Sequence, residues 1–109
     1  MKIDAHIHIF SQNVAGNRAF YLNDAGFRLL YDNEKSRIAT VCDAIKYASE
    51  NQFDSLWCMG FCWSSGEQCE RENERIVRET DGNNRLILFT SVSSSPDPLV
   101  KKRIRDARK

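Results

Sequence analysis

The stretch Lys2-Ile3-Asp4-Ala5-His6-Ile7-His8-Ile9 alternates polar and apolar side chains with a period of two. Successive side chains of a β-strand point to opposite faces, so this alternation predicts a strand over 2–9 with one apolar face and one polar face. The expected apolar face carries Ile3, Ala5, Ile7 and Ile9. The opposite face is expected to carry Lys2, Asp4, His6 and His8.

The rest of the chain continues this strand as an alternation of helices and strands. A loop over 10–23 and a helical turn over 24–31 are expected to precede a helix over 36–51, whose apolar residues recur at helical spacing. Next come a strand over 53–60, a helix over 67–80, a strand over 85–92, and a last helix that begins at Asp97-Pro98. This order predicts an α/β fold with a parallel sheet, in one domain over 1–109.

Composition and charge limit the possible partners and the compartment. The 109 residues are 41% hydrophobic and 28% charged with a net charge of +1, which gives no reason to expect nucleic acid or an anionic membrane as partner. The basic run from Lys101 to Lys109 is interpreted as a solvated helix face. Four cysteines without a visible signal or membrane-spanning segment predict free thiols and a cytoplasmic location.

The two histidines of the chain, His6 and His8, stand two positions apart in the first strand. Same-face residues at this spacing are about 6.5–7 Å apart at the backbone, so both imidazoles can lean onto one metal ion. Asp4 on the same face would then be a hydrogen-bond acceptor that orients a ligand. The alternative for the two histidines is that they are solvated polar residues, and the alternative for Asp4 is a buried or rim carboxylate that serves only the fold.

Four segments resemble the amidohydrolase-2 branch of the amidohydrolase superfamily, which includes aminocarboxymuconate-semialdehyde decarboxylase. Ile3 to Phe10 looks like the N-terminal signature of that branch, and Glu72-Asn73-Glu74 resembles its glutamate-asparagine step. Met59-Gly60-Phe61-Cys62-Trp63 resembles the segment that closes strand two, with Cys62 in place of the usual proline. The segment from Asn84 to Val92, followed by Ser95-Pro96, resembles the third strand and its proline-ended loop.

The resemblance implies a (β/α)8 TIM barrel with a divalent metal, usually Zn²⁺, at its C-terminal mouth. His6 and His8 match the two metal ligands of strand one, and Phe61 and Trp63 would line the substrate pocket. Aromatic packing under a loop is the alternative for Phe61 and Trp63. The implied activity is hydrolysis or decarboxylation of a small organic acid, amide or lactone, which makes the protein a hydrolase or a lyase.

The same resemblance implies that the chain is incomplete as an enzyme. A catalytic zinc ion needs about three protein ligands, and a full TIM barrel needs roughly 200 residues or more. The chain has no third histidine and supplies three of eight strands. We therefore expect the first three βα units of a truncated barrel, inactive alone, with the general acid or base outside this chain. Its open sheet is expected to self-associate or to bind the missing C-terminal part.

Two other functions stay open at the level of sequence. The first is that the chain is a non-catalytic remnant or an interaction module. In the second, the paired histidines belong to a TatD-like nuclease or a PHP-type phosphoesterase, which would place more metal carboxylates and phosphate-binding basic groups at the strand ends. The segment Gly60-Phe61-Cys62-Trp63 disfavours this second reading, and the spacing of Cys58, Cys62 and Cys69 argues against a zinc site made of thiolates.

Overall fold

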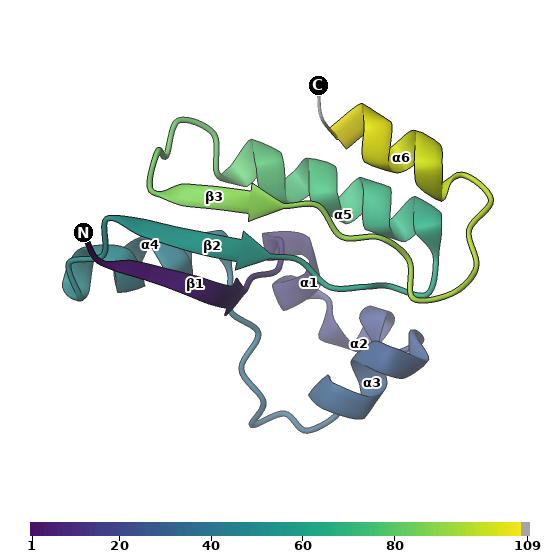
Figure 1. Ribbon diagram of the computed structural model, residues 1–109. Coiled ribbons are helices and arrows are strands. Elements are labelled where there is room, and N and C mark those ends of the chain that lie inside the picture. Colours follow the sequence, from purple (N-terminus) through teal and green to yellow (C-terminus); the bar gives the residue numbers. More distant parts are fainter. Residues whose placement is uncertain (108–109) are drawn as a thin grey trace.

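The computed structural model, which describes residues 1–107, contains a three-stranded parallel sheet covered by helices. The strands are β1 (Ile3–His8), β2 (Ser55–Met59) and β3 (Leu86–Phe89), and they lie in the spatial order β1-β2-β3. Figure 1 shows the three arrows pointing the same way, with α2 and α3 lying beyond their C-terminal ends. The predicted α/β class with parallel strands is confirmed.

The segment that follows β1 is helical where a plain loop was predicted over 10–23. It forms α1 (Gln12–Gly16) and α2 (Arg18–Tyr21). The Ser11 side chain caps α1 by accepting a hydrogen bond from the Val14 backbone N–H at 3.3 Å. The helical turn predicted over 24–31 is confirmed as α3 (Ala25–Tyr31), capped by the Asp24 side chain.

The helix predicted over 36–51 begins five residues later, as α4 (Val41–Glu50). The Phe10 backbone N–H donates to the Ala39 carbonyl at 2.8 Å, and Phe10 forms a parallel bridge with Thr40. This pairing holds the residues before Thr40 in an extended conformation. Thr40 and Asp43 then close a reciprocal capping box, so the backbone enters the helix only at Val41.

The second crossover helix matches its prediction closely. The expected helix over 67–80 is α5 (Gly66–Glu79), and the Ser65 hydroxyl accepts a hydrogen bond from the Gln68 N–H at 3.3 Å. β3 ends at Phe89, three residues earlier than expected, because the backbone of Ser91 is bonded on both sides by the Asn73 side chain. Those two bonds draw the chain away from the sheet and towards α5.

The last helix, α6 (Val100–Ala107), begins later than the predicted start at Asp97-Pro98. Asp97 caps a turn there, because its Oδ1 accepts the Leu99 N–H at 3.0 Å and its carbonyl accepts the Val100 N–H at 3.1 Å. Residues 108 and 109 of the basic run lie outside the described residues. Within residues 1–107, no helix has the length and apolar character needed to cross a membrane.

Two hydrophobic clusters hold these elements together. The first lies between the sheet and the helices α4 and α5, and consists of Ile9, Val41, Ala44, Ala48, Leu56, Cys58, Ile76 and Leu86. The second, which we call the aromatic cluster, packs the segment after β1 against the loop before α5, and consists of Phe10, Val14, Tyr21, Phe27, Ile38, Trp63 and Cys69. Because α4 and α5 both contact the first cluster, they cover the same face of the sheet.

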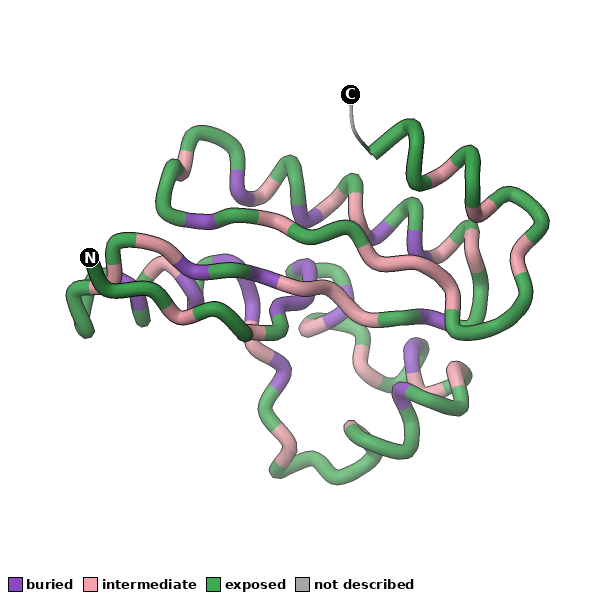
Figure 2. The backbone as a smooth tube through the Cα atoms, viewed as in Figure 1, coloured by how far each residue is buried: buried purple, intermediate pink, exposed green. Residues whose placement is uncertain are grey.

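The opposite face of the sheet, which we call the bare face, has no helix over it among the described residues. Figure 2 shows that β1 has no buried residue, whereas β2 buries every second side chain. Leu56 and Cys58 point into the first cluster, so Trp57 between them points to the bare face. Large apolar side chains there keep 36–46% of their surface exposed, namely Ile3, Trp57, Ile87 and Phe89.

Candidate metal site

His6 and His8 lie together at the C-terminal end of β1, on the bare face of the sheet. The strand register pairs His8 with Met59, which follows the buried Cys58, and the two imidazoles touch one another. Their Nε2 atoms are 3.0 Å apart, and their ring planes are inclined by 64°. Both side chains are exposed, so the structure brings the two predicted ligands into one accessible pair.

The distance between the two Nε2 atoms fits half of a zinc site. Two nitrogens bound to one tetrahedral zinc at about 2.0–2.1 Å lie roughly 3.3 Å apart, and the observed separation of 3.0 Å is close to this value. Without a metal, a 3.0 Å contact requires one Nε2 to carry a hydrogen and the other to accept it. A metal ion would replace that shared proton, because an imidazole binds a metal through its unprotonated nitrogen.

Asp4 lies on the other face of the sheet from the two histidines, which corrects the prediction from simple alternation. Asp4 pairs with Leu56 and Ile7 pairs with Cys58, so three steps along β1 match two steps along β2. This irregularity shifts the period of two and places Asp4 on the helix-covered side. Ile3, predicted to share one face with Ile7, consequently lies on the bare face and is 41% exposed.

The Asp4 carboxylate bonds to the backbone and to α4 and does not contact an imidazole in this structure. Its Oδ1 accepts the His6 backbone N–H at 3.2 Å, and its Oδ2 accepts the Tyr47 hydroxyl at 3.2 Å. Asp4 therefore stabilises the irregular backbone that carries His6. Any contribution of Asp4 to a metal site would be indirect, through the position of the strand.

The part of the chain that the structure describes brings no third ligand to the pair. Within residues 1–107, no three His, Cys, Asp or Glu side chains gather in a way that could hold a metal ion. Zinc binds four ligands in structural sites and at least three protein ligands in catalytic sites. The histidine pair could therefore hold a metal ion only together with further ligands from another segment or another molecule.

A shallow groove of about 320 Å³ runs between β1 and α4, with His8 on its wall. Its polar side chains include the ion pair of Arg37 and Asp43, whose closest N and O atoms are 3.1 Å apart. The groove lies along the edge of β1 that β2 does not occupy. Sequence reasoning missed Arg37 and Tyr47, because neither belongs to a short motif with the histidines.

Of the two aromatic residues predicted at the substrate pocket, Trp63 belongs to the aromatic cluster and Phe61 packs against it. Trp63 is only 1% exposed, and its ring centroid lies 5.2 Å from those of Tyr21 and Phe27. Phe61 is half-buried, with its ring centroid 4.9 Å from that of Trp63. In this structure Trp63 offers no surface to a substrate, so the alternative interpretation, aromatic packing under a loop, describes it.

A buried polar network was also missed by sequence reasoning, although Glu72 belongs to a motif noted for its resemblance. The Glu72 carboxylate is 3% exposed and accepts the Ser11 hydroxyl at 2.5 Å and the Tyr21 hydroxyl at 3.0 Å. Arg75 contacts the same carboxylate, and the ion pair counters the cost of burying its charge. Burial, followed by the nearby Glu72 charge, raises the pKa of Tyr21. The network fastens the segment after β1 to α5.

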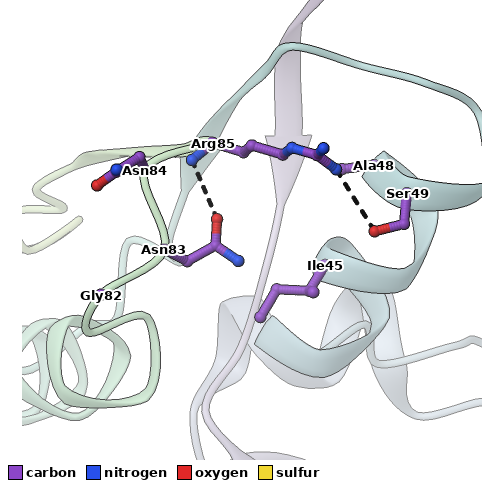
Figure 3. Close-up of a pocket in the computed structure, with 7 residues that line it drawn as sticks. All are labelled: Ile45, Ala48, Ser49, Gly82, Asn83, Asn84 and Arg85. Atoms are coloured by element: carbon purple, nitrogen blue, oxygen red, sulfur yellow. Dashed lines mark hydrogen bonds between the residues drawn. The ribbon is translucent and has the colours of Figure 1, made fainter.

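A second hollow, of about 290 Å³, lies at the opposite end of the sheet from the histidines (Figure 3). Figure 3 shows Arg85 crossing it towards Ser49, while Asn83 accepts the Arg85 backbone N–H at 3.0 Å. Its lining is Ile45, Ala48, Ser49, Gly82, Asn83, Asn84 and Arg85. None of these seven is a histidine, cysteine or acidic residue, so the hollow offers no side chain of the kinds that bind zinc.

Three comparisons with known proteins complete the description of the site. The chain was compared with protein-family models, with curated proteins and with solved structures. No family model, no curated protein and no solved structure matches it.

Proposed function

We propose that this chain forms the first three βα units of a metal-dependent TIM-barrel enzyme of the amidohydrolase type, which hydrolyses or decarboxylates a small organic acid, amide or lactone. The observation that carries the proposal is the histidine pair, with Nε2 atoms 3.0 Å apart at the C-terminal end of the first parallel strand. TIM-barrel enzymes place their catalytic groups at that end of their strands.

The arrangement of the sheet also supports the proposal. The strands follow one another in the order β1-β2-β3, and both crossover helices pack on one face. A barrel is built by repeating this unit in one direction, with helices outside and the opposite face inside. The histidine pair would then face the barrel interior, and the polar ends of the strands would form the mouth.

The residues of this chain have limited roles in the proposed reaction. His6 and His8 would hold the metal, and Asp4 would keep the strand in the shape that brings their Nε2 atoms together. Zinc at such a site supplies Lewis acidity, which polarises a substrate carbonyl and acidifies bound water. The general acid or base would come from a segment outside these 109 residues.

Zinc binding by the isolated chain tests the metal-ligand role. We expect the wild-type chain to bind Zn²⁺ in a competition titration, and we expect His6→Ala and His8→Ala each to weaken the affinity at least about tenfold. Tyr47→Phe is the matched control, because it removes the contact to Asp4 and leaves both imidazoles. Equal zinc affinity of the wild-type chain and the two alanine variants would remove the metal site from the proposal.

A further inference from the structure

The histidine pair adjoins an apolar strip on the bare face of the sheet. Ile3, Trp57, Ile87 and Phe89 form this strip, and each of them is 36–46% exposed. The rings of Trp57 and Phe89 contact one another across β2 and β3, with centroids 5.9 Å apart. Exposed apolar side chains gathered on one face are typical of an interaction surface.

The coordination of a metal at the histidine pair is half complete in one copy of the chain. Closed zinc sites are tetrahedral, and His6 and His8 fill two of the four positions. A two-fold symmetric dimer uses the same surface on both subunits, so every ligand that one copy presents is presented twice. Two copies meeting near the symmetry axis would therefore supply four imidazoles.

We propose that two copies of this chain meet through their bare faces and share one zinc ion, which is held by His6 and His8 of each copy. The proposal rests on the metal-ligand role of the histidine pair in the proposed function, and it applies to the 109-residue chain by itself, whose bare face is not enclosed by further strands of a barrel. The net charge of each copy is only +1, so electrostatic repulsion between two copies is small.

The size of the apolar strip indicates that the dimer depends on the metal. From their exposed fractions, its four side chains offer roughly 350 Å² per copy, since large side chains present about 150–250 Å² each when fully exposed. A stable interface buries about 800 Å² per partner. The strip alone is too small for a stable dimer, and the shared ion would make up the difference.

Sedimentation velocity of the full 109-residue chain tests the proposal. With Zn²⁺ we expect a dimer that contains one zinc ion per two chains, and with EDTA we expect the monomer. His6→Ala and His8→Ala should each stay monomeric at zinc concentrations that dimerise the wild type. A Cys42→Ser/Cys62→Ser variant is the matched control, because it removes the two exposed thiols that could also bind zinc and should still dimerise.

Three results would overturn the shared site. A monomer that binds one zinc per chain would remove the dimer and leave the metal-ligand role intact. A dimer that persists in EDTA and in His6→Ala would show that the metal does not hold the copies together. A chain that binds no zinc would remove both this proposal and the metal site of the proposed function. Circular dichroism of each variant checks the fold. Because both histidines are exposed, replacing either of them should leave the spectrum unchanged.

Discussion

The two faces of the sheet are built from alternate residues of the same strands and differ in what covers them. On one face Leu56 is fully buried under α4 and α5, and on the other Trp57, the next residue, keeps 36% of its surface exposed. The first face carries the packing that holds the fold. The second carries His6 and His8, and no helix among the described residues covers it.

Substitutions of Leu56 and Ile87 compare most directly how much each face contributes to the free energy of unfolding. Leu56→Ala should lower the free energy of unfolding by about 3 kcal/mol, because it opens a cavity between the sheet and its helices. Ile87→Thr removes apolar surface from a side chain that is already 46% exposed, so its cost should stay below about 1 kcal/mol. Urea unfolding of both variants measures the difference. Equal losses would mean that the bare face is covered in solution by something else.

The chemical reactivity of the cysteine thiols should differ between buried and exposed positions. Burial raises the pKa of Cys58 and of Cys69 from the ordinary 9.0 to about 11, whereas Cys42 and Cys62 are exposed. A rise of two pKa units lowers the thiolate fraction about a hundredfold. Iodoacetamide at pH 8 should therefore label Cys42 and Cys62 in the folded protein and all four cysteines in urea, as read by mass spectrometry. Early labelling of Cys58 would show that the helix-covered face opens readily.

Glu72 and Glu50 extend the comparison to charged pairs on two helices. Glu72→Ala should cost about 2 kcal/mol, because it leaves the buried hydroxyls of Ser11 and Tyr21 without their acceptor. Glu50→Ala removes an exposed partner of Lys46, at an N–O distance of 3.8 Å, and should cost less than about 0.5 kcal/mol. Thermal unfolding of the two variants measures both costs. A small loss for Glu72→Ala would indicate that water replaces the carboxylate.

Asp24 caps α3 and gives a smaller effect than Leu56 or Glu72. Burial alone would raise its pKa, but hydrogen bonds from the backbone N–H groups of Ser64 and Phe27 outweigh burial and hold the pKa below the ordinary 3.8. Its stabilisation is therefore complete above pH 3.8 and is lost as the pH falls through the folded-state pKa. Asp24→Ala should cost about 1 kcal/mol at pH 7, as expected for the loss of a helix cap.

The pH profile separates this role of Asp24 from general acid unfolding. The difference in unfolding free energy between the wild type and Asp24→Ala should shrink as the pH drops below 3.8, because the protonated carboxyl gives up most of its advantage as an acceptor. Urea unfolding at several pH values measures that difference. A difference that stays constant with pH would assign the effect to packing instead.

The sequence predicted an element accurately where the residues that start and end it lie close to it in the chain. The cap at Ser65 and the Asp81-Gly82 stop predicted α5 to within one residue at each end. The start of α4 could not be predicted in this way, because it depends on the bridge between Phe10 and Thr40, thirty positions apart. Ile38 stands at helical spacing from Val41 and Ile45, so the pattern placed it in the helix. In the structure its side chain belongs to the aromatic cluster instead.

The candidate site shows the same division between local and distant causes. The contact between His6 and His8 follows from their spacing on one strand, so it could be predicted. The side on which Asp4 lies depends on how β1 pairs with β2, fifty residues away, and a period of two cannot reveal an irregularity in that pairing. The Glu72 network joins residues 61 positions apart, so no short motif contains it.

The hydrogen bond from Phe10 to Ala39 has a consequence for how this architecture can vary. It brings the two ends of the segment 11–38 together at the mouth of the sheet, with an N–O distance of 2.8 Å. Insertions in a segment with adjacent ends are tolerated at its exposed loop tips, where the backbone carries little packing. The exposed stretch 32–35 could thus be lengthened without moving the histidine strand, whereas Val14, Tyr21 and Phe27 anchor the rest of the segment in the aromatic cluster.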